Sequence, residues 1–150
     1  MKRILSLDGG GIRGVFSLEI LLHMQQLLRD SYGRPDLVLA DHFDMFAGTS
    51  TGAIIATCLC WGMTVEAVLD LYEKHGQTMF RPVSWSKPLK KLFFARYEAR
   101  PLSEFLLNLF SEDGDGKVPA LLGSERLRKA LLVEILEWRS LIRHRKMPRK

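Results

Sequence analysis

The first half of the chain alternates between short apolar runs and longer stretches of helical periodicity. Arg3–Leu7 is short and apolar, and it predicts a buried strand that leads into a glycine-rich loop. From Gly14 onward, apolar residues recur at helical spacing up to the turn-rich Tyr32–Asp36, which predicts a helix that ends there. Phe43–Ala47 predicts a second strand. This order is typical of a parallel sheet covered by helices.

The middle of the chain predicts two more helices. Ala53–Trp61 is apolar on nearly every side, which indicates a buried helix, and Gly62 is suited to end it. Thr64–Gln77 has one apolar face and a threonine at the N-cap position. Arg81–Tyr97 differs from both, because it interleaves prolines, lysines and aromatic residues. We expect an irregular surface segment there.

The last third of the chain predicts helices at Ser103–Phe110 and from Ser124 to about Arg145, separated by the polar turn Glu112–Lys117. It also accounts for the formal net charge of +5. Residues 139–150 hold six Lys or Arg and no acidic residue, which leaves 16 basic and 17 acidic residues elsewhere, a net charge of −1. We therefore expect no nucleic-acid binding by the fold. The tail is expected to be solvated, and contact with an anionic membrane is the alternative.

Composition places the chain among ordinary globular proteins. Its 150 residues, 47% hydrophobic and 26% charged, suffice for one domain with a buried core. No apolar run approaches the roughly 18 residues of a membrane-spanning helix, and Asp8 ends the apolar N-terminus too early for a signal peptide. We expect a cytoplasmic protein. Cys58 and Cys60, two apart in a predicted helix, are expected to be buried free thiols rather than a disulfide or a metal site.

The second predicted strand is followed at once by Gly48-Thr49-Ser50-Thr51-Gly52. This is a G-x-S-x-G sequence, the pattern of a nucleophilic serine on a sharp strand-to-helix turn. The two glycines remove side chains that would collide in such a turn. The N–H groups at the start of the next helix would point toward Ser50, and Thr51 N–H is the natural local donor to an oxyanion. A small-residue turn that only packs a helix on a strand is the alternative.

The first predicted strand is followed by Asp8-Gly9-Gly10-Gly11-Ile12-Arg13-Gly14. Its glycines satisfy G-x-G-x-x-G, the dinucleotide-binding fingerprint, but no acidic residue stands at a strand end about 20 positions on. Consecutive glycine N–H groups can instead converge on the negative charge that develops when Ser50 attacks a carbonyl. This interpretation explains both glycine turns, whereas a nucleotide site leaves the serine turn unexplained. Arg13 would steady the loop or add positive potential.

In this order and at this spacing, the two turns closely resemble those of the patatin-like phospholipase family, over roughly residues 3–110. The resemblance implies an α/β fold with three α/β/α layers and a mostly parallel central sheet. It also implies hydrolysis of acyl lipids by a Ser–Asp dyad, with Ser50 as nucleophile and with neither metal nor cofactor. The residues that we expect in the oxyanion hole are Gly9, Gly10, Gly11 and Thr51, and those that support the turns are Asp8, Arg13, Gly14, Gly48 and Gly52.

The general base of that family is not found in this chain. It is an aspartate in an Asp-Gly-Gly or Asp-Gly-Ala turn downstream of the serine, and neither tripeptide occurs after Ser50. The nearest imitations, Asp113-Gly114-Asp115 and Asp115-Gly116-Lys117, lie in a hydrophilic loop with no apolar strand before them. The histidines are expected in surface or capping roles: His23, His42, His75 and His144.

The C-terminal segment also departs from the family pattern. In the family a strand usually follows the helix that corresponds to Ser124–Leu132, whereas here Val133–Arg139 continues with helical charge spacing. We therefore expect an incomplete copy of the domain. Its N-terminal part would occupy residues 1–132, and a divergent basic tail would occupy 133–150. A fragment, an alternative product and a shifted reading frame stay open as its origin.

These observations predict a serine-dependent lipid acyl hydrolase of phospholipase A or esterase type, acting on a phospholipid or a similar ester, with weak turnover by these 150 residues alone. Peripheral contact with an anionic membrane stays an open alternative beside this prediction. Two alternatives stay open. The chain could act only as a lipid- or partner-binding module, or its glycine loop could serve a nucleotide-binding domain.

Overall fold

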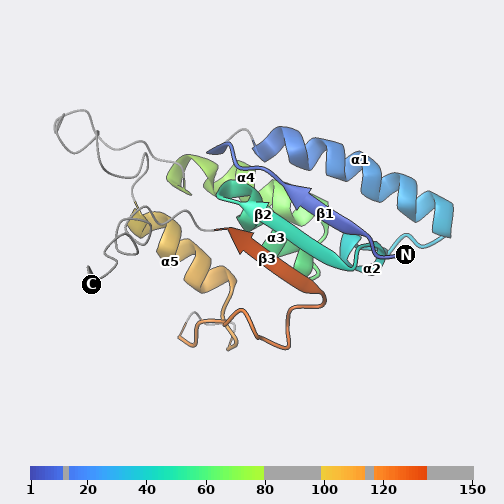
Figure 1. The fold of residues 1–150 in the computed structure, drawn as a ribbon. Coiled ribbons are helices and arrows are strands. Elements are labelled where there is room, and N and C mark those ends of the chain that lie inside the picture. The colour runs from blue at the N-terminus through green and yellow to red at the C-terminus, as the bar shows by residue number, and fades with distance from the viewer. Residues whose placement is uncertain (12–13, 80–98, 114–116, 135–150) are drawn as a thin grey trace, which may run out of the picture.

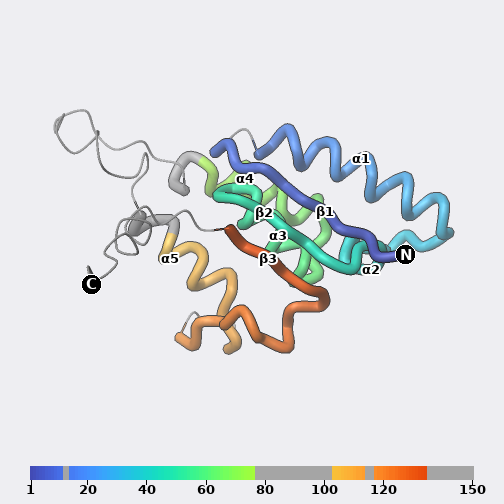
Figure 2. Tube along the Cα trace, viewed as in Figure 1, coloured from blue at the N-terminus to red at the C-terminus, as the bar shows by residue number. Residues whose placement is uncertain are grey.

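The computed structural model describes residues 1–11, 14–79, 99–113 and 117–134, and it contains a sheet of three parallel strands (Figure 1). The elements along the chain are β1 (Ile4–Leu7), α1 (Gly14–Tyr32), α2 (Leu39–His42), β2 (Met45–Thr49), α3 (Thr51–Cys60), α4 (Val65–Met79), α5 (Ala99–Leu109) and β3 (Ala130–Glu134). The tube in Figure 2 shows β2 in the middle of the sheet, between β1 and β3. The predicted α/β class with a parallel sheet is therefore confirmed.

Helices cover one face of the sheet in the described part of the chain. Helix α3 packs against all three strands, and α1, α2 and α4 contact α3 in turn. In Figure 1, α3 and α4 lie behind the strands. The strand order explains this arrangement, because two right-handed crossovers in the same direction place their helices on the same face. The opposite face exposes apolar side chains, with Ile4 59% and Leu132 56% exposed.

The core lies between the sheet and the helices, and α3 is its centre. The helix is apolar on nearly all sides, as the sequence predicts, and most of its residues are buried. Cys58 and Cys60 are buried free thiols, which confirms that expectation. Burial raises the pKa of Cys58 to about 12 and also raises that of Cys60. The largest fully buried side chains include Leu18, Leu39, Phe46, Ile55, Leu59, Val65 and Val68.

Helix α4 is joined to α1 by polar groups at its N-terminal end. Thr64 caps the helix as predicted, because its Oγ1 accepts the Ala67 N–H at 3.2 Å. Gln25, which sequence reasoning left unremarked, is fully buried on α1. Its Oε1 accepts the Val65 N–H at 3.3 Å, and its Nε2 donates to Glu66 at 2.7 Å. The Gln25 amide thus accepts one N–H group that the first turn of α4 would otherwise leave without a partner, and it donates to a carboxylate of the same turn.

The structure moves the second strand by two residues relative to its predicted position. We expect Phe43–Ala47 from the sequence, whereas β2 spans Met45–Thr49 and includes Gly48. The helix that follows begins at Thr51 rather than Ala53. Hydrogen bonds from the Asp44 and Met45 N–H groups to Arg3 O mark where β2 begins to pair with β1. Only Ser50 therefore separates the strand from the helix at the serine turn.

The helix predicted from Ser124 to about Arg145 is wrong in its described part. Residues 121–129 form turns, and Ala130–Glu134 is the strand β3, parallel to β2. A short apolar run cannot be assigned to strand or helix by periodicity alone, and pairing with β2 decides the conformation. The Arg128 N–H donates to Cys60 O at 2.9 Å and so attaches the segment before β3 to the end of α3. A strand thus exists where we expected none, and one reason for expecting an incomplete domain disappears.

Other predictions are either confirmed or fall outside the described residues. The helices predicted from Gly14 and at Thr64–Gln77 correspond to α1 and α4, and the helix predicted at Ser103–Phe110 corresponds to α5. The Arg81–Tyr97 segment and the basic tail 139–150 lie outside the described residues. Among the helices that the structure describes, none combines the length and the apolarity needed to cross a bilayer.

Candidate active site

Ser50 occupies a strained turn at the carboxyl end of β2. Its backbone has φ 53° and ψ −121°, and it is the only non-glycine residue with positive φ in the described part of the chain. Such a conformation is unfavourable for a residue with a Cβ and persists only where the surroundings impose it. The side chain is exposed, although Thr51 and Gly52 beside it are buried. This is the geometry expected of a serine presented at the top of a sheet.

Gly48 and Gly52 allow the backbone to turn sharply at Ser50. A Cβ on Gly48 would collide with the Gly52 carbonyl and lie 2.6 Å from the Ala53 nitrogen. A Cβ on Gly52 would collide with Leu7 O and lie 2.7 Å from Asp8 O. The first glycine lets α3 start against β2, and the second lets α3 rest against the end of β1. Both positions therefore require the absence of a side chain.

The glycine-rich loop lies directly against the serine. A Cβ on Gly9 would stand 2.8 Å from Ser50 Cβ and 3.5 Å from Ser50 Oγ, so the Ser50 side chain lies in direct contact with the loop that follows β1. The loop is fixed by a buried hydrogen bond in which Gly11 N–H donates to Thr51 Oγ1 at 3.0 Å. Farther on, a Cβ on Gly14 would lie 3.1 Å from Thr51 Cγ2. The structure thus brings together the two turns that the sequence singles out.

The remaining residues of the glycine loop are placed as follows. Asp8 and Gly9 are exposed at the carboxyl end of β1, Gly10 is half-buried and Gly11 is buried. Arg13 lies outside the described residues. Helix α3 points its N-terminus at this edge, so its first N–H groups and the positive end of its dipole face the region around Ser50.

None of the proton acceptors weighed from the sequence contacts Ser50 among the described residues. The Asp113 carboxylate accepts the N–H groups of Lys117 and Val118, both at 3.2 Å, and so holds its own loop. His23 and His75 are exposed on helices, with the His75 ring packed against Phe105. Asp115 and His144 lie outside the described residues.

His42 is at the opposite, amino edge of the sheet, in α2. Its ring contacts Tyr32, with 5.9 Å between the ring centroids, and its Nδ1 lies 3.5 Å from the Tyr32 hydroxyl. Burial, and then the nearby Arg3 charge, lowers its pKa. His42 therefore lies at the opposite end of β2 from Ser50.

Glu134 is a carboxylate at the serine's edge of the sheet that sequence reasoning missed. It ends β3 directly opposite Thr49, whose Oγ1 donates to Glu134 Oε2 at 3.3 Å. It stands on the β3 side of β2, whereas the Ser50 side chain lies against Gly9 on the β1 side. A strand prediction for Ala130–Glu134 would have located Glu134 at the carboxyl end of the sheet from the sequence alone. This hydrogen bond joins Glu134 to Thr49 on β2 rather than to the Ser50 hydroxyl.

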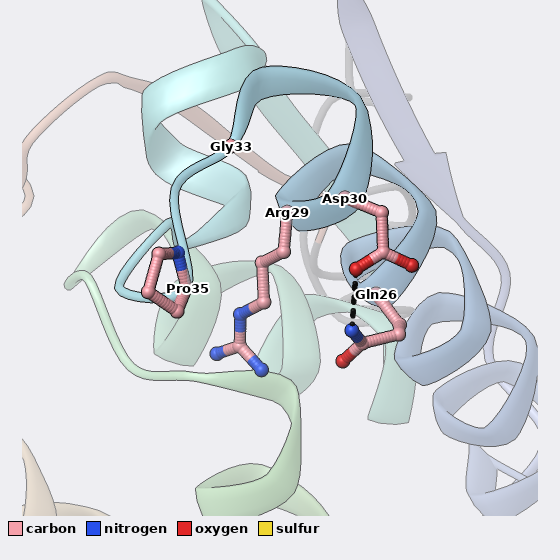
Figure 3. A pocket seen from close by; sticks show the side chains of 5 residues that line it. All are labelled: Gln26, Arg29, Asp30, Gly33 and Pro35. Atoms are coloured by element: carbon pink, nitrogen blue, oxygen red, sulfur yellow. Dashed lines mark hydrogen bonds between the residues drawn. The ribbon is translucent and has the colours of Figure 1, made fainter.

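A separate cavity of about 490 Å³ lies at the C-terminal end of α1. Figure 3 shows Pro35, Arg29, Gln26 and Asp30 among the residues that line it, with Gln26 hydrogen-bonded to Asp30. The Arg29 guanidinium is already engaged by Glu66 and by Leu37 O. The cavity is therefore a polar surface hollow at the far end of α1 from the glycine loop. In the part of the chain that the structure describes, no three His, Cys, Asp or Glu side chains gather as a metal site would require.

Comparison with known proteins places the whole described fold in one family. The family model described as patatin-like phospholipase matches residues 5–144. It therefore extends through β3, beyond residue 132, where we place the domain boundary from the sequence. That boundary stays a prediction.

Individual relatives give the same result. A cGAMP-activated phospholipase of Vibrio cholerae is 29% identical over 118 residues, which is 74% of this chain and 33% of that protein. A cGAMP-activated phospholipase of Escherichia coli is 34% identical over 104 residues, 68% of this chain and 29% of that protein. Patatin-17 of Solanum cardiophyllum is 33% identical over 89 residues, 55% of this chain and 23% of that protein. The chain thus spans a third or less of the length of these relatives.

Proposed function

The chain belongs to the patatin-like phospholipase family, and on that premise we propose that it is a serine-dependent hydrolase of acyl lipids. One observation carries the proposal: the glycine loop after β1 lies against the side chain of Ser50 after β2. A nucleophile beside a row of backbone N–H groups is the arrangement that acyl transfer requires. A serine turn that served packing alone would not need an exposed hydroxyl in a strained conformation.

In the proposed reaction, Ser50 Oγ attacks the carbonyl carbon of an ester, and its proton passes to a base. The Thr51 N–H and the Gly9–Gly11 loop stabilise the oxyanion of the tetrahedral intermediate. The ester C–O bond then breaks, the alcohol leaves with a proton, and the acyl group stays on Ser50. Water hydrolyses this acyl-enzyme, which releases the fatty acid and restores the hydroxyl. Because Gly11 N–H already donates to Thr51 Oγ1, we assign Gly11 chiefly to holding the loop.

The proton acceptor is the missing part of this mechanism. The Asp-Gly-Gly or Asp-Gly-Ala turn expected from the family resemblance is absent after Ser50. An oxyanion hole without a base leaves only a small residual rate. We therefore expect these 150 residues to acylate Ser50 slowly and to turn over esters weakly.

Labelling with a fluorophosphonate probe tests the nucleophile directly. The 150-residue chain is incubated with the probe, and the modified serine is identified by peptide mass spectrometry. We expect slow labelling confined to Ser50, none in Ser50→Ala, and unchanged labelling in Ser6→Ala, which removes an exposed hydroxyl from the neighbouring strand. Labelling that persists in Ser50→Ala contradicts the proposal. Rapid labelling of Ser50 contradicts only the expectation that no effective base is present.

The substrate class follows from the family and is part of the proposal. Phospholipids in mixed micelles and simple carboxylic esters are the substrates to compare, with release of free fatty acid as the measurement. The cytoplasmic location expected from the sequence stays a prediction, as does peripheral contact with anionic membranes.

A lipid- or partner-binding role without catalysis is the second candidate. The exposed apolar residues on the uncovered face of the sheet, Ile4 and Leu132, favour it. Flotation with anionic liposomes separates the two functions. Binding that depends on Arg143, Arg145 and Lys146, in a chain whose Ser50 the fluorophosphonate probe does not label, favours the binding module over the hydrolase.

A further inference from the structure

We propose that Tyr72 is a positioning residue for the oxyanion-binding turn, because its hydroxyl holds the Thr51 carbonyl while the Thr51 side chain holds the glycine loop. The inference rests on the proposed function, since it concerns the same turn. It adds a residue from α4, 21 positions beyond Thr51, that no motif in the sequence points to.

The contact is made in the interior of the protein. Tyr72 is 2% exposed and Thr51 is 3% exposed. The Tyr72 hydroxyl donates to Thr51 O at 3.3 Å. The ring also packs at the start of α1, since a Cβ on Gly14 would lie 3.4 Å from Tyr72 Cε1. One side chain therefore touches the first turns of both helices that follow the two glycine-rich turns.

Thr51 connects this contact to the glycine loop. Its carbonyl accepts the Tyr72 O–H, and its Oγ1 accepts the Gly11 N–H at 3.0 Å. The peptide between Thr51 and Gly52, which Tyr72 holds, shares the Thr51 Cα with the peptide whose N–H is the proposed oxyanion donor. A chain of contacts thus runs from α4 through the start of α3 to the loop that faces Ser50.

This chain of contacts would keep Ser50 in its strained conformation. A residue with φ 53° tends to relax unless its neighbours are fixed, and Thr51 is the neighbour on the helix side. A phenylalanine would fill the same space, so the hydroxyl is explained by the bond that it makes. Burial, and then the nearby Cys58, raises the pKa of Tyr72, so the hydroxyl remains a donor throughout the neutral range.

Amide hydrogen exchange tests the positioning without reference to activity. Tyr72→Phe keeps the ring and removes the hydroxyl, and Tyr32→Phe is the matched control, because Tyr32 is exposed beside His42 at the other edge of the sheet. We expect the amides of Gly9–Gly11 to exchange roughly fivefold faster in Tyr72→Phe, the factor that corresponds to one neutral hydrogen bond. Tyr32→Phe should leave them unchanged. Thr51→Val removes the acceptor of the Gly11 N–H, and its amide exchange rate at Gly11 serves as the reference for a loop without this hydrogen bond.

Phosphonylation kinetics provide the functional readout. We expect Tyr72→Phe to lower the maximal rate of Ser50 labelling roughly fivefold, by the same single hydrogen bond, with the half-saturating probe concentration unchanged. A merely structural role would lower the melting temperature and leave this rate constant unaltered.

The two proposals fail in different ways. Wild-type exchange rates at Gly9–Gly11 in Tyr72→Phe overturn the positioning role, whatever the labelling shows. If Tyr72→Phe does not fold in plain buffer, both chains are compared in an osmolyte such as TMAO, which strengthens effective burial, and equal exchange rates at Gly9–Gly11 there overturn the positioning role. A wild-type chain whose Ser50 is never labelled overturns the hydrolase, and the exchange measurement still decides the role of Tyr72.

Discussion

The two ends of the parallel strands are held together in opposite ways. At the carboxyl end, Gly48 and Gly52 let backbone meet backbone, and Ser50 is held in a strained conformation. At the amino end, charged side chains connect the elements: Asp44 accepts the Arg3 N–H at 2.9 Å, and Asp41 pairs with Arg128 at 2.7 Å. At the carboxyl ends of the strands, here called the carboxyl edge, the packing requires glycines that have no side chain. At the amino ends, here called the amino edge, it relies on charged side chains.

This difference indicates which edge serves chemistry and which serves stability. Strain and close backbone approach cost free energy, and they persist where a reactive group must be presented. Ion pairs and hydrogen bonds at the amino edge join β1, α2 and the segment before β3 and present no nucleophile. We expect substitutions at the carboxyl edge to separate stability from activity, and those at the amino edge to change stability alone.

The largest effect is expected from Gly52→Ala. The added methyl group would collide with Leu7 O and press on Asp8 O, both of which are backbone atoms that cannot rotate away. We expect a loss of about 3 kcal/mol in the free energy of unfolding, measured by urea denaturation. Gly123→Ala is the control, since nothing lies within 4 Å of its Cβ, and it should change stability by less than about 0.5 kcal/mol. Equal effects of the two substitutions would show that Gly52 is not a point of close approach.

Ser50 should reveal the strain through a gain in stability. Ser50→Gly relieves the positive φ and should raise the free energy of unfolding by about 1 kcal/mol, the relief exceeding the added chain entropy. Ser50→Ala keeps a Cβ and therefore the strain, so it should leave stability near the wild-type value. Both variants should lose probe labelling completely. A Ser50→Gly variant no more stable than Ser50→Ala would remove the claim of strain and leave the nucleophile assignment intact.

The carboxyl edge was the more predictable of the two from sequence, because its requirements are local. Glycine spacing around Ser50, the apolar run before it and the helix after it are all read within one stretch of chain. Strand β3 was missed because Ala130–Glu134 contains leucines and a glutamate that also suit a helix, and only pairing with β2 decides. The hydrogen bond from Tyr72 to Thr51 was missed for a related reason. A tyrosine on an apolar helix face does not indicate, from sequence alone, which carbonyl accepts its hydroxyl proton.

At the amino edge, Asp41→Asn should weaken the fold without touching the site. Asp41 pairs with both Arg34 and Arg128, so the substitution removes two ionic contacts that are partly shielded from solvent. We expect a loss of about 0.7 kcal/mol in the free energy of unfolding and an unchanged rate of Ser50 labelling. Asp36→Asn is the matched control, because its pair with Arg34 is more exposed, and it should cost less. A labelling rate that falls in Asp41→Asn would mean that the two edges are coupled.

The smallest effect tests α3, the helix that connects the two edges. The folded-state pKa of Cys58 is raised to about 12 from 9.0, so the thiol stays neutral in the fold while it ionises in the unfolded chain. Its stabilising contribution is therefore complete below pH 9 and is lost as the pH rises from 9 toward 12. Already at pH 9, linkage predicts a loss of about 0.4 kcal/mol relative to pH 7. Urea denaturation at both pH values measures it, and Cys58→Ala should show a smaller loss because it lacks this ionisation. If wild type and Cys58→Ala lose stability equally, the thiol reaches water in the folded chain, and α3 does not hold the two edges as one packed unit.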